Sequence, residues 1–256
     1  MMAERPAQRA VELAALRAGV ELGLTLIDTA EMYADGESER LVGEALRGLR
    51  EQVFLVSKAY PQNASQQRLP QACEASLKRL GTDRLDLYLL HWRGRVPLAE
   101  TVAAMEKLVA AGKIRRWGVS NLDTPDLQEL MAAGGTACAT DQILYNLTRR
   151  GPEHDLLPWL AGRGIPIMAY SPIEQGRLLD NPRLQAIAAN LNATPAQVAL
   201  AWVIQQGQVL AIPKAGTVAH VQENRAAAEL SLSASDLATL DAAFPLPGKR
   251  RPLEML

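Results

Sequence analysis

The sequence predicts an α/β protein, and within that class a (β/α)8 barrel, from three observations. Short apolar and β-branched runs recur along the chain, and helical patterns with apolar residues near a 3.6-residue period lie between them. Alternation of this kind favours a parallel sheet covered by helices, and in 256 residues a closed barrel is the economical arrangement. No linker or low-complexity segment interrupts the alternation, so we expect residues 1–256 to form a single domain.

Seven of the apolar runs are predicted to be strands buried on both faces, because their apolar positions are continuous and do not alternate. In chain order, the predicted strands are residues 24–30, 53–59, 85–91, 114–121, 139–146, 165–172 and 209–215. The helical patterns between them include SERLVGEALRGL, LPQACEASLKRL, LAETVAAMEKLVAAGK, PDLQELMAAG and TPAQVALAWVIQQG.

An eighth strand is not visible in the sequence, and the opening segment, residues 7–22, is predicted to be a helix. The chain therefore starts after the first strand of an eight-stranded barrel, closes a barrel with seven strands, or leaves the sheet open at that seam. An open, doubly wound sheet is the rival fold class. It is disfavoured because no G-x-G-x-x-G follows the first predicted strand, and nucleotide-binding sheets of that class usually need those glycines next to a pyrophosphate.

The composition favours a small molecule as the ligand. A formal net charge of −1 gives no reason to expect nucleic acid or an anionic membrane as a partner. Cys73 and Cys138 lack the spacing of metal ligands, so no metal site is expected. Charges are scattered through the first 23 residues, where a signal peptide needs an apolar core, and no apolar run approaches the ~18 residues of a membrane span. We therefore expect a cytoplasmic protein.

Polar side chains stand at the ends of the predicted strands, beginning with Asp28, Lys58 and His91. The active site of a (β/α)8 barrel lies at the carboxyl ends of its strands, so these three side chains are expected to meet there. Asp28 and Lys58 would keep each other ionised in a low-dielectric site. The Lys58 charge would also favour the phenolate of Tyr33, on the next loop, and lower the pKa of its phenol. The later strands end with Ser120 and Asn121, with Gln142 and Asn146, and with Tyr170 and Ser171.

In its motifs the chain resembles the aldo-keto reductases. IDTAEMY, VSKAY, LYLLHW, KIRRWGVSN, DQILYN, AYSP and IPKAGTVAHVQEN occur in the family's order, and the resemblance runs from about residue 8 to the C-terminus. It implies a barrel of the aldo-keto reductase type with Tyr33 as the general acid. It further implies that Asp28 and Lys58 set the pKa of that acid and that His91 orients the substrate carbonyl. The sequence is most similar to bacterial members that act on methylglyoxal and other 2-oxo aldehydes, or on diketo-gluconate.

The resemblance also implies NADPH as the cofactor. The matching positions are Ser120, Asn121 and Gln142 for the nicotinamide carboxamide, Tyr170 for stacking on the nicotinamide, Ser171 for the pyrophosphate, and Lys214, Thr217, His220, Glu223 and Asn224 for the adenosine end. Many members carry an arginine for the 2′-phosphate where this chain has His220, which leaves Lys214 as the fixed cation there. A helix predicted to start beside Lys214 adds an anion site, so a modest preference for NADPH over NADH is expected.

One departure concerns the N-terminus. The family usually shows a Gly-rich first strand of the type G-x-G-T-W before the first helix, and this chain shows none. The resemblance therefore implies an N-terminally shortened chain.

The expected function is NADPH-dependent reduction of small aldehydes and ketones to alcohols, with 2-oxo aldehydes such as methylglyoxal as substrates. Arg93 and Arg95, in the short loop after His91, are expected to favour a carboxylate or 2-oxo group nearby. Two alternatives stay open: Lys58 acts as a Schiff-base nucleophile in an aldolase-type barrel, or the protein binds NADPH in a regulatory role without turnover. The expected partner is a small carbonyl compound, with neither nucleic acid nor a membrane. A monomer is expected, and an oligomer is left open.

Overall fold

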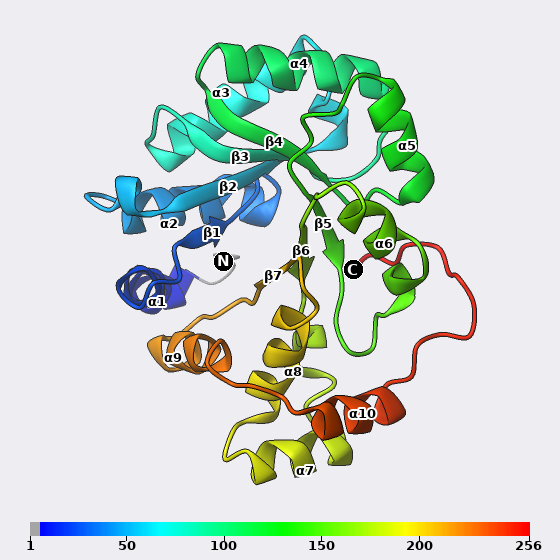
Figure 1. Ribbon diagram of the computed structural model, residues 1–256. Coiled ribbons are helices and arrows are strands. Elements are labelled where there is room, and N and C mark those ends of the chain that lie inside the picture. The colour runs from blue at the N-terminus through cyan, green and yellow to red at the C-terminus, as the bar shows by residue number, and fades with distance from the viewer. Residues whose placement is uncertain (1–5) are drawn as a thin grey trace. The chain divides into compact units, whose positions relative to one another are not determined.

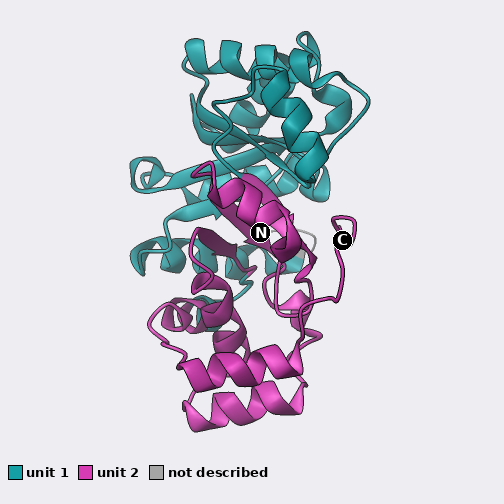
Figure 2. Cartoon of the chain, turned by 45° about the vertical axis from the view of Figure 1, so that its right-hand side comes forward, with its two compact units in different colours: residues 1–140, 215–221 teal, residues 141–214, 222–256 magenta. Residues whose placement is uncertain are grey.

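The computed structural model describes residues 6–256, which divide into two compact units (Figure 1; Figure 2). Unit 1 comprises residues 1–140 and 215–221, of which residues 1–5 lie outside the described part. Unit 2 comprises residues 141–214 and 222–256. The division passes through one helix, α9 (Val218–Ala227). The expectation of a single domain stays a prediction.

Unit 1 is built on four parallel strands that pair in chain order. The strands are β1 (Leu26–Asp28), β2 (Phe54–Ala59), β3 (Leu85–Leu90) and β4 (Ile114–Ser120). The helices are α1 (Arg9–Glu21), α2 (Glu37–Ala45), α3 (Arg68–Leu80), α4 (Leu98–Ala110) and α5 (Thr124–Ala132). Short 3-10 segments are η1 (Pro6–Gln8), η2 (Tyr33–Gly36), η3 (Arg50–Gln52) and η4 (Pro61–Asn63). All six residues of β3 are buried, as its continuous apolar pattern predicts.

The close packing of α2 against α3 depends on Gly43. A Cβ atom at this position would lie 2.4 Å from the carbonyl oxygen of Leu80, the last residue of α3. Backbone atoms cannot yield to such a contact, so only glycine fits here. The residue that follows α3, Gly81, has a φ of 64°, the left-handed conformation in which helices commonly end.

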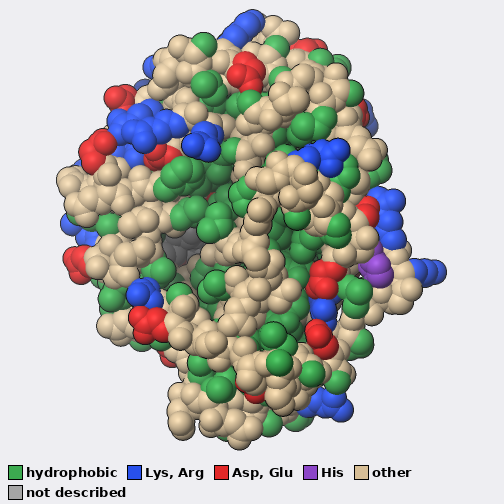
Figure 3. All heavy atoms as spheres, viewed as in Figure 1, with side chains coloured by type: hydrophobic (Ala, Val, Ile, Leu, Met, Phe, Trp, Pro, Cys, Tyr) green, Lys and Arg blue, Asp and Glu red, His purple; other side chains and the backbone are tan. Residues whose placement is uncertain are grey.

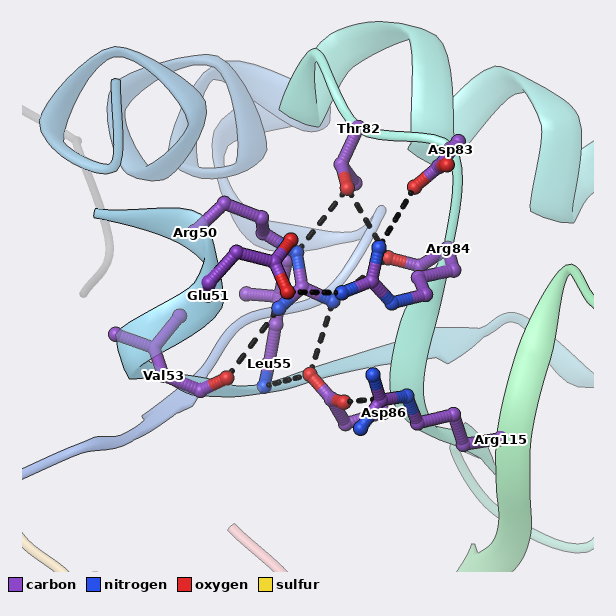
Figure 4. A network of polar contacts seen from close by, with 9 residues as sticks. All are labelled: Arg50, Glu51, Val53, Leu55, Thr82, Asp83, Arg84, Asp86 and Arg115. Atoms are coloured by element: carbon purple, nitrogen blue, oxygen red, sulfur yellow. Dashed lines mark hydrogen bonds and ion pairs between the residues drawn. The ribbon is translucent and has the colours of Figure 1, made fainter. Parts of the chain in front are cut away.

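A buried carboxylate, Asp86, joins the amino-terminal ends of β2 and β3 (Figure 4). Its Oδ2 accepts hydrogen bonds from the backbone N–H of Leu55 and from Arg50 Nη2, both at 2.9 Å. Arg115 Nε lies 3.3 Å from Oδ1, and Arg50 also donates to the carbonyl oxygen of Arg84. Because both oxygens of Asp86 have cationic partners, the cost of burying its charge is offset, and the network fixes the strand ends opposite the predicted site.

Unit 2 contains three parallel strands, again paired in chain order. They are β5 (Asp141–Leu144), β6 (Ile167–Tyr170) and β7 (Val209–Ile212). The other elements are η5 (Gly151–His154), α6 (Leu156–Ala161), η6 (Glu174–Gly176), α7 (Pro182–Asn190), α8 (Pro195–Ile204) and α10 (Ala234–Ala243). The α8 helix begins with a capping box, in which Thr194 and Gln197 bond each other's backbone N–H. Its residues 198–203 are all buried, so α8 is the core helix of this unit.

Each predicted strand contains one observed strand, and the observed strands are shorter. The shortest strand is β1, which has only three residues. Leu24 is not part of it, because its N–H bonds the carbonyl oxygen of Gly19 and closes the end of α1, with Gly23 left-handed at a φ of 83°. Within residues 6–256 no eighth strand is present.

The apolar length of the helices and the distribution of surface charge bear on possible membrane and nucleic-acid partners. No single helix within residues 6–256 is long and apolar enough to cross a membrane; α7 and α8 together pass such a test by length and composition, but they are bent by 89° at the break between them. On the face shown in Figure 3, basic and acidic side chains are interspersed.

Candidate active site

Lys58 is the centre of the predicted catalytic group, and unit 1 brings three of its partners to it. Its side chain is fully buried, and its Nζ donates to Asp28 Oδ2 at 2.6 Å, to the carbonyl oxygen of Thr29 at 2.9 Å and to Tyr33 Oη at 3.2 Å. An ammonium group has three N–H donors, so each one has an acceptor. The parallel pairing of β1 with β2 places the end of one strand beside the end of the other, which is why Asp28 and Lys58 meet.

The charge of Lys58 follows from these contacts. Burial alone lowers the pKa of a lysine, but the Asp28 carboxylate and the Tyr33 phenol outweigh it, and the pKa of Lys58 lies above its ordinary value. The group is therefore an ammonium ion at neutral pH. It is held 4.8 Å from the centre of the Tyr33 ring as well as beside its oxygen.

The backbone directly after Tyr33 is strained. Ala34 and Asp35 have φ values of 49° and 50°, in the left-handed region that non-glycine residues seldom occupy, and Gly36 follows at 85°. Each such non-glycine residue costs about 1–3 kcal/mol, so the surrounding structure must hold the turn. A Cβ at Gly36 would lie 2.6 Å from Arg79 Cδ, which shows how closely the turn rests on that side chain.

A buried ion pair between Glu39 and Arg79 supports this turn. Glu39, fully buried, accepts hydrogen bonds from Arg79 Nε at 2.5 Å and from Ser57 Oγ at 2.6 Å. Arg79 Nη2 also donates to Ser76 Oγ at 3.1 Å. Successive side chains of a strand point to opposite faces, so Ser57 faces this ion pair while its neighbour Lys58 faces Tyr33. The pair thus supports both residues of the lysine–tyrosine contact, and it was not predicted from the sequence.

His91 follows β3 directly and lies against Tyr33. The two rings form an edge-to-face pair with centroids 5.8 Å apart, and the backbone N–H of His91 bonds the carbonyl oxygen of Ala59. Burial, with the nearby charge of Lys58, lowers the pKa of His91 to about 3, so the imidazole is neutral. Its Nδ1 is buried and has no hydrogen-bond partner among the described residues. A neutral imidazole carries one N–H and can donate it to a carbonyl oxygen.

Two aromatic side chains extend the site beyond His91. Trp92 packs on His91 with centroids 4.9 Å apart, and Tyr60 meets Trp92 edge to face at 5.9 Å. The loop that carries Tyr60 is held by Glu31, whose Oε1 accepts the N–H of Tyr60 at 2.6 Å and Asn63 Nδ2 at 3.0 Å. Glu31 lies between Asp28 and Tyr33 in the chain, so it links the loop that carries Tyr33 to the loop that carries Tyr60. Neither Glu31 nor Tyr60 was predicted from the sequence to belong to the site.

Arg93 does not have the role expected for it. Its guanidinium donates to the carbonyl oxygens of Gly94 and Val96 and to the carboxylate of Glu129 on α5. These contacts fold the loop after His91 onto α5 and occupy the donors that a substrate carboxylate would need. The expectation is therefore withdrawn for Arg93, while Arg95 is exposed.

Several predicted cofactor residues lie in unit 1. Ser120, buried, ends β4, and Asn121 follows it with a φ of 59°. Asn121 Nδ2 donates to the carbonyl oxygen of His91 at 3.2 Å and to Ser120 Oγ at 3.1 Å, so these residues are joined to the catalytic group. In the segment 215–221, Thr217 Oγ1 accepts the N–H of His220 and caps the start of α9, where His220 itself is exposed.

The other predicted cofactor residues lie in unit 2. Gln142 is buried in β5, Tyr170 ends β6 and is partly exposed, and Ser171 follows with a φ of 47°. Lys214 and Glu223 are exposed, and Asn224 is partly exposed. An exposed lysine and a capped helix start are the kind of groups that bind phosphate, so the residues present fit a dinucleotide. No group of three or more possible metal ligands lies together within residues 6–256.

Known proteins resemble this chain over its whole length. The model of the aldo/keto reductase family matches residues 2–244. Methylglyoxal reductase YeaE of Escherichia coli (strain K12) is 60% identical over 261 residues, which cover 100% of this chain and 92% of that protein. Glyoxal reductase of Bacillus subtilis (strain 168) is 36% identical over 227 residues, which cover 89% of this chain and 81% of that protein. A crystal structure of an aldo-keto reductase from Klebsiella pneumoniae in complex with NADPH has a TM-score of 0.97 and 56% identity, covering 100% of this chain and 92% of that one.

Proposed function

Because this chain belongs to the aldo/keto reductase family, we propose that it reduces small 2-oxo aldehydes such as methylglyoxal, with Tyr33 as the proton donor. The expected family and fold class, an α/β barrel of the aldo-keto reductase type, are confirmed by the family match and by the structural likeness. The chain is an oxidoreductase that reduces carbonyl groups with NADPH. The substrate and the roles of individual residues are the proposal.

The observation that carries the proposal is the contact between Lys58 Nζ and Tyr33 Oη, at 3.2 Å. The same Nζ also donates a hydrogen bond to Asp28. Bound NADPH would supply the hydride that reduces the carbonyl carbon. Tyr33 gives its hydroxyl proton to the carbonyl oxygen, and Lys58 stabilises the phenolate that remains. Asp28 keeps Lys58 charged and in place. His91 donates its single N–H to the same oxygen and so orients the substrate toward Tyr33.

The proposed cofactor contacts are those of the sequence analysis. Ser120, Asn121 and Gln142 would bind the carboxamide and Tyr170 would stack on the nicotinamide, while Ser171 would bind the pyrophosphate. Lys214, Thr217, His220, Glu223 and Asn224 would bind the adenosine end. The support is the chemistry of these groups: a capped helix start and an exposed lysine suit a phosphate, and the amides of Asn121 and Gln142 suit a carboxamide.

The proposal of 2-oxo aldehydes rests on the similar reductases and on the wall of the site. Two relatives bear the names methylglyoxal reductase and glyoxal reductase. In this chain Trp92 and Tyr60 offer apolar ring surface with a polar edge, and Arg93 is engaged elsewhere. A small uncharged dicarbonyl compound suits these surroundings, because the two aromatic rings carry no charge and the guanidinium of Arg93 is paired with Glu129.

The Schiff-base alternative is disfavoured by the state of Lys58. A lysine nucleophile must lose its proton, but the pKa of Lys58 is raised and all three of its N–H groups have acceptors. Borohydride added with substrate would attach carbon to Lys58 only if this alternative were correct.

The direct test is the loss of NADPH absorbance with methylglyoxal. We expect turnover that depends on the aldehyde, and the alcohol as the product. NADPH alone and pyruvate, the corresponding acid, serve as controls. Tight binding of NADPH in a fluorescence titration, with no oxidation by any 2-oxo aldehyde, would favour the regulatory alternative and contradict the proposal.

We also propose a cytoplasmic location and a monomeric state. The ground for the first is that both cysteines, Cys73 and Cys138, are free and buried, as reduced thiols in the cytoplasm are. The monomer is carried over from the sequence analysis, and size-exclusion chromatography with light scattering tests it.

A further inference from the structure

The loop after β6, residues 171–177, has an unusual backbone. Ser171, Glu174 and Gln175 have φ values of 47°, 49° and 55°, and Gly176 follows at 89°. Three non-glycine residues in the left-handed region within five positions are costly, and such strain persists only where neighbouring groups over-determine the conformation. The loop must therefore be held by specific contacts.

Glu174 supplies most of those contacts. Its side chain is buried, with the residue 4% exposed, and its Oε1 accepts Arg149 Nη2 at 2.8 Å and Arg177 Nη2 at 2.9 Å. Its Oε2 accepts Asn146 Nδ2 at 2.8 Å, and the same amide donates to the carbonyl oxygen of Ser171 at 2.9 Å. Burial would raise the pKa of Glu174, but the hydrogen bonds from Arg149, Asn146 and Arg177 outweigh it, and the pKa lies below its usual range. The carboxylate is thus charged and closes the loop on itself.

Arg149 extends this network to the C-terminal tail, residues 245–256. While Nη2 holds Glu174, Nη1 donates to Glu254 Oε1 at 2.7 Å. One guanidinium therefore joins a carboxylate of the loop to a carboxylate two residues from the chain end. The tail has another ion pair, between Arg250 Nε and Asp155 Oδ2 at 2.9 Å, that does not involve this loop.

We propose that Glu174 and Arg149 are positioning residues for NADPH, and that Glu254, through Arg149, makes the C-terminal tail a determinant of cofactor affinity. The inference rests on the proposed function, in which Tyr170 and Ser171 contact the cofactor. A loop already held in one conformation loses less entropy when a ligand binds. If the loop adopts that conformation only part of the time, the apparent dissociation constant rises in proportion.

The test is a fluorescence titration of four proteins with NADPH: the wild type, Glu174→Gln, Glu254→Gln and, as the matched control, Arg250→Gln. Glu174→Gln removes the charge that three residues bind, and we expect it to raise the dissociation constant about tenfold or more. Glu254→Gln should raise it by a smaller factor of about three, because Glu174 still holds Arg149. Arg250→Gln loosens the tail at Asp155 and should leave the constant unchanged.

A purely structural role predicts a different pattern. In that case the melting temperature would fall in Glu254→Gln and Arg250→Gln alike, and affinity would not separate them. Our inference also predicts that kcat at saturating NADPH stays near the wild-type value while the KM for NADPH rises. In the double variant of Glu174 and Glu254, the two effects should be less than additive, because both act through Arg149.

The outcomes separate this inference from the proposed function. If the wild type does not bind NADPH, the proposed function fails and the inference fails with it. If the wild type binds and Glu174→Gln binds equally tightly, only the inference is overturned. Should Glu174→Gln not fold, Glu254→Gln decides, since its side chain is 41% exposed; an affinity equal to that of Arg250→Gln would overturn the proposal.

Discussion

The hydroxyl of Tyr33 lies 3.2 Å from the Lys58 ammonium and its ring packs against the neutral imidazole of His91, and this arrangement supports Tyr33 as the proposed proton donor by elimination. Lys58 has a raised pKa and all its N–H groups are engaged in hydrogen bonds, so its ammonium group is a weak acid. His91 has a pKa of about 3 and is already neutral at pH 7, so it has no imidazolium proton to give. The remaining candidate is Tyr33, the acid in our proposal, whose conjugate base Lys58 would stabilise.

Tyr33→Phe tests this assignment at the level of one oxygen atom. The ring stays against His91 while the proton donor is lost, so we expect kcat to fall by about 10²–10⁴-fold with little change in NADPH affinity. Tyr60→Phe is the matched control, since it removes a phenol from the same site but keeps the contact with Trp92. Steady-state kinetics on methylglyoxal measure both. Turnover within a few-fold of wild type in Tyr33→Phe would rule out Tyr33 as the acid.

The Glu39–Arg79 pair shows why some site residues are invisible in a single sequence. Asp28, Lys58 and His91 stand at the ends of apolar runs, where a charge is conspicuous, and the fold class says that strand ends meet. Glu39 and Arg79 are 40 residues apart on amphipathic helices, whose charged residues are usually solvated. Only the packing of α2 on α3 turns them toward each other. The left-handed backbone at Ala34 is likewise set by tertiary contacts, since alanine does not favour it locally.

At the scale of elements, the seven strands were predictable because continuous apolar runs have few other uses in a chain of this length. The residues at which the strands begin and end were less predictable. Leu24 is apolar and reads as strand, yet its N–H is used to close α1, and hydrogen bonds of that kind are not encoded in hydrophobic periodicity. The role of the β6 loop was inferred through the family resemblance, and two of the residues that hold Glu174, Arg149 and Asn146, lie 25 and 28 positions from it in the sequence.

The contact between α2 and α3 gives the element-scale prediction. Gly43→Ala places a Cβ against the Leu80 carbonyl oxygen, so the helices must separate, and we expect a loss of about 1–3 kcal/mol in the free energy of unfolding. Gly19→Ala, inside α1, is the matched control. Its Cβ would meet only side-chain atoms, at 3.6 Å or more, so the usual helix preference for alanine should leave stability equal or higher by up to about 1 kcal/mol. Denaturant unfolding compares the two. Equal effects would show that the helices pack less closely than described.

At the scale of the whole molecule, acid sensitivity arises in both units. His91 in unit 1 has a pKa lowered from 6.5 to about 3, and Glu174 in unit 2 has a lowered pKa as well. In both cases the unfolded chain binds a proton at a pH where the folded chain does not. Protonation therefore favours unfolding, and stability contributed by these groups is present at higher pH and lost as the pH falls.

The pH range over which protonation lowers stability differs between His91 and Glu174. For His91 the loss begins near pH 6.5 and continues toward pH 3, whereas for Glu174 it begins only near its ordinary value of 4.5. We predict that His91→Asn flattens the pH dependence of stability between pH 6.5 and 5 by up to about 1.4 kcal/mol per pH unit, the contribution of one proton. Denaturant unfolding at several pH values measures the slope. An unchanged slope in the variant would mean that the imidazole is not held neutral.

The burial of Lys58 also determines which amines of this protein a chemical reagent can modify. The sequence has six lysines, and the other five are Lys78, Lys107, Lys113, Lys214 and Lys249. Acylating reagents attack unprotonated amines in contact with solvent, and Lys58 is neither unprotonated nor exposed. Attachment of this protein to a solid support through its lysines should therefore spare the proposed proton-transfer site. The single lysine proposed to contact the cofactor, Lys214, is exposed, and saturating NADPH during coupling would shield it.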